Sequence, residues 1–122
     1  MTIICVDNVP IMLQSLQESA TTAFPNANIQ TFYATESALS YATKNGCDVL
    51  LCEINPPRLE GLFLAEKIKE INPKVNIIFV TVCSESEHAR AVMRLKPSGY
   101  LTKEATGAQL LDELRNLRYP VA

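Results

Sequence analysis

Short, continuously apolar runs that alternate with helical patterns constrain the fold of this chain more than any other feature. Runs such as TIICV at 2–6 and DVLLCEI at 48–54 are rich in residues that favour strands and do not alternate with polar ones. Continuous apolar runs of this length are typical of strands buried on both faces. We predict five strands, at Thr2–Val6, Asn28–Tyr33, Asp48–Ile54, Val75–Cys83 and Ser98–Thr102.

After each strand, apolar residues recur every three or four positions, which predicts an amphipathic helix. The apolar positions are Met12, Leu13, Leu16 and Ala20; Ala38, Leu39 and Ala42; Leu62, Leu64, Ala65, Ile68 and Ile71, in a helix from Leu59; Ala91, Val92 and Leu95; and Leu110, Leu111, Leu114 and Leu117. The expected boundary signals are Pro10 in the first helix, Thr35 as N-cap and Gly46 as terminator of the second, and the capping boxes Ser84–Glu87 and Thr106–Gln109.

Five consecutive strand–helix units predict a parallel sheet with helices on both faces. Right-handed crossovers leave few topologies, and the strand order 2-1-3-4-5 is the common one at this size. The fold class expected is therefore α/β, a flavodoxin-like (βα)5 three-layer sandwich. At 122 residues, the chain is expected to form one domain over residues 1–122.

The charge pattern argues against several classes of partner. The net charge is −2, and the basic residues are spread along the chain, so we expect no nucleic-acid binding by this domain itself and no membrane binding. The start of the chain, Met1–Asp7, resembles neither a signal peptide nor a membrane span. A cytoplasmic location is the expectation.

The four cysteines are predicted to be buried, reduced thiols. Cys5, Cys47, Cys52 and Cys83 include no C-x-x-C pair, and the single histidine is too little for a zinc site. A redox role for Cys83, two residues after Thr81, is the alternative.

Polar residues follow the predicted strands where each one ends. They are Asp7 and Asn8, Glu53, Thr81 and Lys103. In open α/β sheets the ligand site lies at the carboxyl ends of the strands, so these side chains should converge on one edge. Carboxylates suit a divalent cation, and Lys and Thr suit phosphoryl oxygens.

The same positions carry a resemblance that covers nearly the whole chain. It rests on Val6-Asp7-Asn8, on Pro56 before Glu60-Gly61-Leu62, on Val80-Thr81, and on Tyr100-Leu101-Thr102-Lys103. Jointly these motifs resemble the receiver domain of two-component response regulators. The resemblance implies a pair of acids that holds magnesium and an aspartate, at the end of the third strand, that accepts a phosphoryl group from a histidine kinase. It also implies a Thr and a Lys that contact the phosphoryl oxygens, and an aromatic residue that changes rotamer on activation.

Asp7, Thr81, Tyr100 and Lys103 match the family pattern, whereas four positions depart from it. Asn8 replaces a magnesium-binding acid, and Glu53 replaces the acceptor aspartate with a side chain one methylene longer. Val82 replaces a small residue, and Glu104 replaces a proline that is typically cis. We count Asn55 with Asp7 and Asn8 in the acidic pocket, and expect at most weak Mg²⁺ binding, at Asp7 and Glu53.

These departures predict a pseudo-receiver, a receiver-like domain that acts by protein interaction without phosphorylation and has no catalytic residues. Two alternatives remain for Glu53: an ion pair with Lys103 that fixes an active-like arrangement, or a solvated acid at the edge of the sheet. A working phosphoacceptor that uses Glu53 or Asp7 is the runner-up. A flavin or nucleotide site is disfavoured, because Asp7 lies where the phosphate would bind.

The expected partners are a histidine kinase or an effector domain. The family's usual dimerisation surface, the fourth helix, fifth strand and fifth helix, makes a homodimer possible, with a polar rim from Glu87, Arg90, Arg94, Glu113 and Arg115. Tyr100 could act as a switch there or simply pack, and packing is slightly favoured. A linker to a DNA-binding domain could begin at 118–122, and the sequence leaves that question open.

Overall fold

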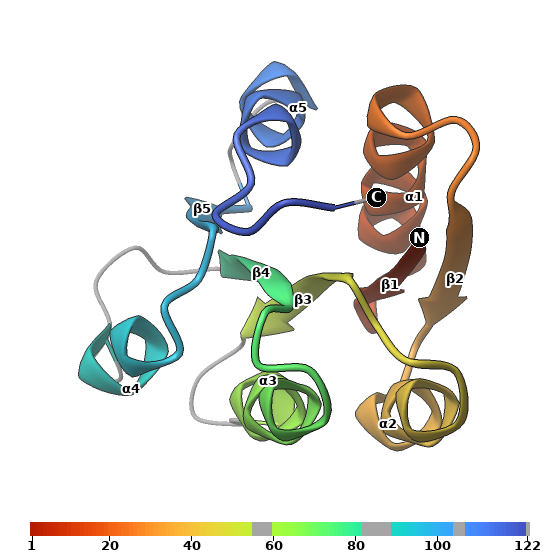
Figure 1. The fold of residues 1–122 in the computed structure, drawn as a ribbon. Coiled ribbons are helices and arrows are strands. Elements are labelled where there is room, and N and C mark those ends of the chain that lie inside the picture. Colours follow the sequence, from red (N-terminus) through yellow and green to blue (C-terminus); the bar gives the residue numbers. More distant parts are fainter. Residues whose placement is uncertain (55–59, 82–88, 104–106, 122) are drawn as a thin grey trace.

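The computed structural model describes residues 1–54, 60–81, 89–103 and 107–121, which form three layers (Figure 1). The middle layer is a parallel sheet in the order β2-β1-β3-β4-β5, which confirms the predicted topology. Its strands are β1 (Thr2–Val6), β2 (Asn28–Phe32), β3 (Val49–Ile54), β4 (Asn76–Thr81) and β5 (Gly99–Thr102). The helices are α1 (Pro10–Ala23), α2 (Thr35–Asn45), α3 (Glu60–Ile71), α4 (Ala89–Arg94) and α5 (Gly107–Arg115).

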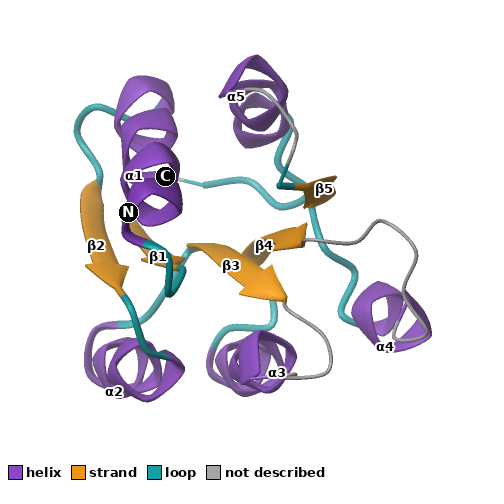
Figure 2. Cartoon of the chain, turned by 180° about the vertical axis from the view of Figure 1, so that it is seen from behind, coloured by secondary structure: helices purple, strands orange, loops and turns teal. Residues whose placement is uncertain are grey.

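The helices divide between the two faces of the sheet. Helices α1 and α5 cover one face, and α2, α3 and α4 lie on the other, as the two opposite views show (Figures 1 and 2). This arrangement agrees with the right-handed connections expected between parallel strands. Within the residues described, no helix is long and apolar enough to cross a membrane.

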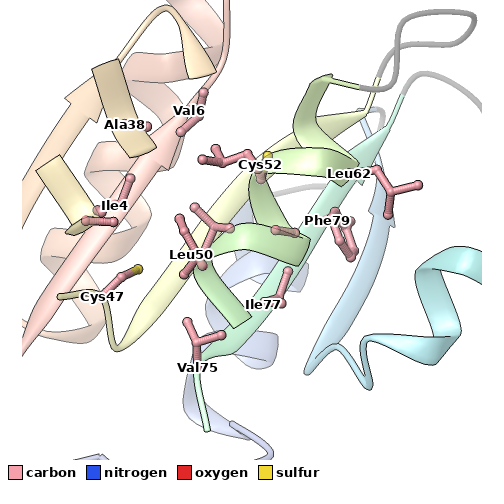
Figure 3. Packing of buried hydrophobic residues seen from close by; sticks show 14 of the residues in the cluster. Ile4, Val6, Ala38, Cys47, Leu50, Cys52, Leu62, Val75, Ile77 and Phe79 are labelled. Carbon is pink, nitrogen blue, oxygen red and sulfur yellow. The ribbon is translucent and has the colours of Figure 1, made fainter. Parts of the chain in front are cut away.

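The core consists of two apolar clusters separated by the sheet. Successive strand residues point to opposite faces, so neighbours in one strand belong to different clusters. In β3, Leu50 joins the first core cluster, under α2, α3 and α4, and Leu51 joins the second, under α1 and α5. The first cluster also contains Phe79 and Ile77 of β4, with Leu62 above them on α3 (Figure 3). Burial on both faces explains why these strands read as unbroken apolar runs.

Gly46 ends α2 as expected, but the start of that helix differs from the prediction. Gly46 adopts a φ of 79°, and its N–H donates to the Ala42 carbonyl. The predicted N-cap, Thr35, is wrong: Ala34 holds the capping position in an extended conformation, and no side-chain hydrogen bond caps the helix. Thr35 is instead the first helical residue, so its hydroxyl lies one position too late to cap.

Strand β1 has its predicted bounds, whereas the other four strands begin or end slightly inside theirs. Strand β2 ends at Phe32, and the next residue, Tyr33, is 62% exposed. Strands β3, β4 and β5 each begin one residue later than predicted. At two of these starts the side chain makes hydrogen bonds instead: the Asp48 carboxylate accepts from the Thr2 N–H at 2.8 Å, and the Ser98 hydroxyl donates to Asn76 Oδ1 at 2.9 Å. Helix α5 ends at Arg115, before the predicted last apolar position, Leu117.

Three of the four cysteines are buried free thiols, as predicted. Burial raises the pKa of Cys5 and of Cys47 to about 12 and also raises that of Cys52. Because the thiolate is the reactive form, these side chains serve as packing groups. Cys83 lies outside the described residues. Of the two predicted capping boxes, Ser84, Glu87 and Thr106 also lie outside them, and only Gln109 is described.

Candidate functional site

The register of the parallel strands brings the predicted polar residues together at one edge of the sheet. Val6 pairs with Cys52, so Asp7 and Glu53, the next residues, come side by side. Thr81 ends β4 opposite Ile54 of β3. The Lys103 N–H donates to the Thr81 carbonyl at 2.7 Å, which fixes the chain just beyond β5. The site therefore forms where three neighbouring strands and the end of β5 meet.

Glu53 is held by two hydrogen bonds from opposite sides of the site. Lys103 Nζ donates to Oε2 at 2.9 Å, and the Asn8 backbone N–H donates to Oε1 at 3.0 Å. The side chains of Glu53 and Lys103 are each only 14% exposed. The expected ion pair with Lys103 is thus present. Both carboxylate oxygens have protein partners, which favours the ion pair over a solvated acid, and the active-like arrangement stays a prediction.

Asp7 places a second carboxylate beside the same ammonium group. Its Oδ2 lies 3.4 Å from Lys103 Nζ, and its side chain is fully buried. Oδ1 accepts a hydrogen bond from the Val9 N–H at 2.9 Å, whereas Oδ2 has no hydrogen-bond partner among the described residues. Asp7, Glu53 and Lys103, the "site triad" below, therefore combine two carboxylates with one ammonium group.

The pKa shifts in the site triad follow from burial and from this excess of carboxylates. Burial raises the pKa of Asp7, and the negative charge of Glu53 adds to the rise, against the lowering effects of the Val9 N–H and Lys103. Burial alone would raise the pKa of Glu53 too, but the hydrogen bonds from Lys103 and Asn8 outweigh it and lower that pKa. Burial would lower the pKa of Lys103, yet the bond to Glu53 and the charge of Asp7 raise it.

Thr81 and Tyr100 lie at the expected strand positions but outside the ion pairs. The Thr81 side chain is buried, and its hydroxyl donates to the Ile54 carbonyl at 2.9 Å. Tyr100 is half-buried in β5 and packs against the first core cluster. This contact agrees with the packing role that the sequence slightly favoured. Asn8 contributes its backbone N–H to the site.

Two predicted site residues, Asn55 and Val82, lie outside the described residues, as does Glu104. The structure therefore leaves their predicted roles as predictions.

The described donors do not fit a tightly held Mg²⁺ ion in this arrangement. Mg²⁺ prefers several oxygen ligands in octahedral geometry. Here the two carboxylates already share the Lys103 ammonium group, at 2.9 and 3.4 Å, and a dication between them would meet that positive charge. Within the part of the chain that is described, no group of three or more His, Cys, Asp or Glu side chains is arranged to hold a metal ion.

Sequence reasoning missed a pocket beside Glu53. The pocket has a volume of about 290 Å³ and lies between the end of β1, the start of α2 and the start of α3. Its lining residues are Val6, Asn8, Tyr33, Ala34, Thr35, Glu36, Glu53, Glu60 and Gly61. The sequence carries no clear signal of this pocket, because Tyr33 is predicted as the last residue of the second strand, whereas in the structure it lies just after β2 and is exposed.

Sequence comparisons relate this chain to bacterial regulators. It is 30% identical over 82 residues to the response regulator UvrY of Escherichia coli strain K12, which covers 67% of this chain and 38% of UvrY. It is 29% identical over 80 residues to the response regulator GacA of Pseudomonas viridiflava, which covers 66% of this chain and 37% of GacA. The matched part therefore spans well under half the length of these relatives.

Structural comparison gives the same fold. A CheY-like response regulator receiver domain protein from Methanospirillum hungatei JF-1 superposes with a TM-score of 0.80, at 21% identity, over 93% of this chain and 90% of that one. The model of the response regulator receiver domain family matches residues 3–115, which include the whole site triad. The chain therefore belongs to the response regulator receiver domain family.

Proposed function

We propose that this domain is a pseudo-receiver, which signals through protein contacts set by a permanent ion pair in place of a phosphoryl group. The observation that carries the proposal is the 2.9 Å contact between Glu53 and Lys103. In the family pattern, the lysine contacts phosphoryl oxygens. Here a carboxylate oxygen of the protein itself already occupies that partner position, and Glu53 takes the place of the acceptor aspartate.

The remaining contacts of the site support the same proposal. Both oxygens of Glu53 accept hydrogen bonds, and the low pKa of this carboxyl group keeps it ionised at neutral pH. A nucleophilic attack on a phosphodonor would require Glu53 to leave Lys103 and the Asn8 N–H. Because these bonds are charge-assisted and largely shielded from solvent, leaving them costs more than leaving water would.

The proposed partners are proteins. UvrY and GacA are named response regulators, and another relative, 25% identical over 80 residues, is named the transcriptional regulatory protein DegU of Brevibacillus brevis. We propose by analogy that this domain contacts a histidine kinase or an effector domain, in a pathway that controls transcription. A homodimer through α4, β5 and α5 is the corresponding proposal for self-association.

Beryllofluoride, a phosphoryl mimic, tests whether the site still accepts a phosphoryl group. We expect an amide NMR titration with Mg²⁺ and beryllofluoride to leave Glu53, Thr81 and Lys103 unchanged in the natural sequence. The matched variant Glu53→Asp restores the acceptor residue type and shortens the side chain by one methylene group. Saturable shifts at these three residues in the natural sequence would show a working phosphoacceptor and overturn the proposal.

The second experiment asks whether the ion pair maintains a signalling conformation. We expect Glu53→Ala to move the resonances of Tyr100 or to change the oligomeric state, measured by NMR and by light scattering. Glu66→Ala is the control, since Glu66 is an exposed acid on α3. If Glu53→Ala and Glu66→Ala both leave Tyr100 and the oligomeric state unaltered, the ion pair does not mimic activation.

A further inference from the structure

The segment that follows α5 is bound at the end of the sheet opposite to the site triad. The family match ends at residue 115, so Leu117–Val121 extends beyond the part shared with the receiver model. This segment runs back from α5 toward α1, past the amino-terminal ends of the strands, and brings the two chain ends close together (Figure 1). Leu117 and Val121 pack against the second core cluster at its margin.

Asn76, the first residue of β4, binds the backbone of this segment through both polar atoms of its carboxamide. Its Nδ2 donates to the Tyr119 carbonyl at 2.9 Å, and its Oδ1 accepts from the Tyr119 N–H at 2.7 Å. The side chain therefore pairs with both backbone groups of a single residue, as a neighbouring strand would. Asn76 is fully buried, so the segment supplies the partners that its carboxamide needs.

Two further side chains complete the attachment. The Ser98 hydroxyl accepts from the Arg118 N–H at 3.0 Å and donates to Asn76 Oδ1 at 2.9 Å. Lys69 of α3 lies 4.9 Å from the centre of the Tyr119 ring, and its Nζ is 3.5 Å from the phenol oxygen. These contacts come from α3, β4 and the residue before β5, which are three separate parts of the fold.

We infer that Leu117–Val121 is a latch. It binds to a site, made by the side chains of Asn76 and Ser98, that recognises backbone N–H and carbonyl groups. The site recognises backbone groups rather than side chains, because it takes the N–H and the carbonyl of Tyr119 and the N–H of Arg118. The latch joins α5 to the starts of β4 and β5. The opposite ends of these two strands lead to Thr81 and Lys103 of the candidate site. The inference is independent of whether Glu53 accepts a phosphoryl group.

Hydrogen exchange of two amides in the full chain tests the latch directly. We expect the Tyr119 and Arg118 N–H groups to exchange at least tenfold more slowly than in an unstructured peptide of the same sequence. Asn76→Ala should return both amides to the peptide rate, since it removes the partner of Tyr119 and frees Ser98. Ser98→Ala should release Arg118 and leave Tyr119 partly protected.

Asn72→Ala is the matched control, because the Asn72 carboxamide donates to the Cys47 carbonyl at the same end of the sheet and not to the latch. We expect it to leave Tyr119 protected. If Asn76→Ala does not fold, Tyr119→Pro removes the Tyr119 N–H that donates to Asn76 Oδ1, and it should release the Arg118 amide. The inference would be overturned if the Tyr119 amide exchanged at the peptide rate in the natural sequence. It would also be overturned if the Arg118 amide kept its protection in both the Asn76 and the Tyr119 variants.

Discussion

At the scale of single residues, the additional methylene group of Glu53, relative to aspartate, accounts for the hydrogen bonds within the site triad. The longer side chain of Glu53 reaches Lys103 Nζ at 2.9 Å and the Asn8 N–H at 3.0 Å, at the same time. Both contacts favour the ionised carboxylate, and this is why its pKa is lowered although burial acts the other way. Asp7 accepts fewer hydrogen bonds, so burial determines the direction of its pKa shift and raises the pKa.

The lowered pKa of Glu53 predicts how stability depends on pH. A carboxyl group whose pKa is lower in the folded state stabilises the fold above its ordinary value, here 4.5, and this contribution is lost as pH falls through the folded pKa. Glu53→Gln should therefore lose about 1 kcal/mol of unfolding free energy at pH 7. The difference in unfolding free energy between the variant and the natural protein should disappear as the pH falls below 4.5. Urea unfolding across this pH range measures it, and a gap that widens in acid would contradict the assignment.

At the scale of elements, α3 reaches the site because its second residue is a glycine. A Cβ atom at Gly61 would overlap the Glu53 carbonyl oxygen and lie 3.0 Å from Cys52 Sγ. The absence of that atom lets the first turn of α3 pack directly on the end of β3. The position of Glu53 thus depends on the close approach of a neighbouring helix.

Replacing this glycine should disturb both packing and site. We expect Gly61→Ala to lower the unfolding free energy by about 1–3 kcal/mol, because the backbone of α3 or β3 must move. Gly107→Ala, in the first turn of α5, is the control, since among the described residues no atom outside its own helix backbone and chain neighbours lies within 4 Å of the added Cβ. That variant should stay within about 1 kcal/mol of the natural protein. Equal effects of the two substitutions in chemical denaturation would refute the close-packing argument.

At the scale of the whole molecule, one sheet joins two cores into a single unit. Leu50 and Leu51 are adjacent in β3 and fully buried, yet they belong to different core clusters. Because the same strand lines both clusters, unfolding of β3 would expose both of them at once. A domain built in this way should unfold in one step.

Truncation on either face should therefore have the same kind of effect. Leu50→Ala and Leu51→Ala should each cost about 2–5 kcal/mol and lower the midpoint of one shared transition. Ile11→Ala, at a side chain that is 74% exposed, should cost less than about 0.5 kcal/mol. Far-ultraviolet circular dichroism and tyrosine fluorescence give two independent probes of urea unfolding. Transitions that separate between the probes would show that the faces unfold independently.

The sequence was most informative where a local pattern determines the structure. Unbroken apolar runs predicted the buried strands and, with them, the order 2-1-3-4-5 and the convergence of Asp7, Glu53 and Lys103. Contacts between a side chain and the backbone of a distant segment escaped it. Nothing in the strand pattern marks Asn76 as the partner of Tyr119, because the two residues lie 43 positions apart and the contact uses backbone atoms of one of them. The Asn8 N–H was missed for the same reason.

The latch also has a practical consequence for attaching other molecules to this domain. It leads the last described residues back toward Met1, at the end of the sheet where the strands begin (Figure 1). Glu53 and Lys103 lie where the strands end. A dye, an affinity tag or a solid support joined to either terminus would therefore sit on the far side of the molecule. Immobilised in this way, the domain would present its site triad outward to any binding partner in solution.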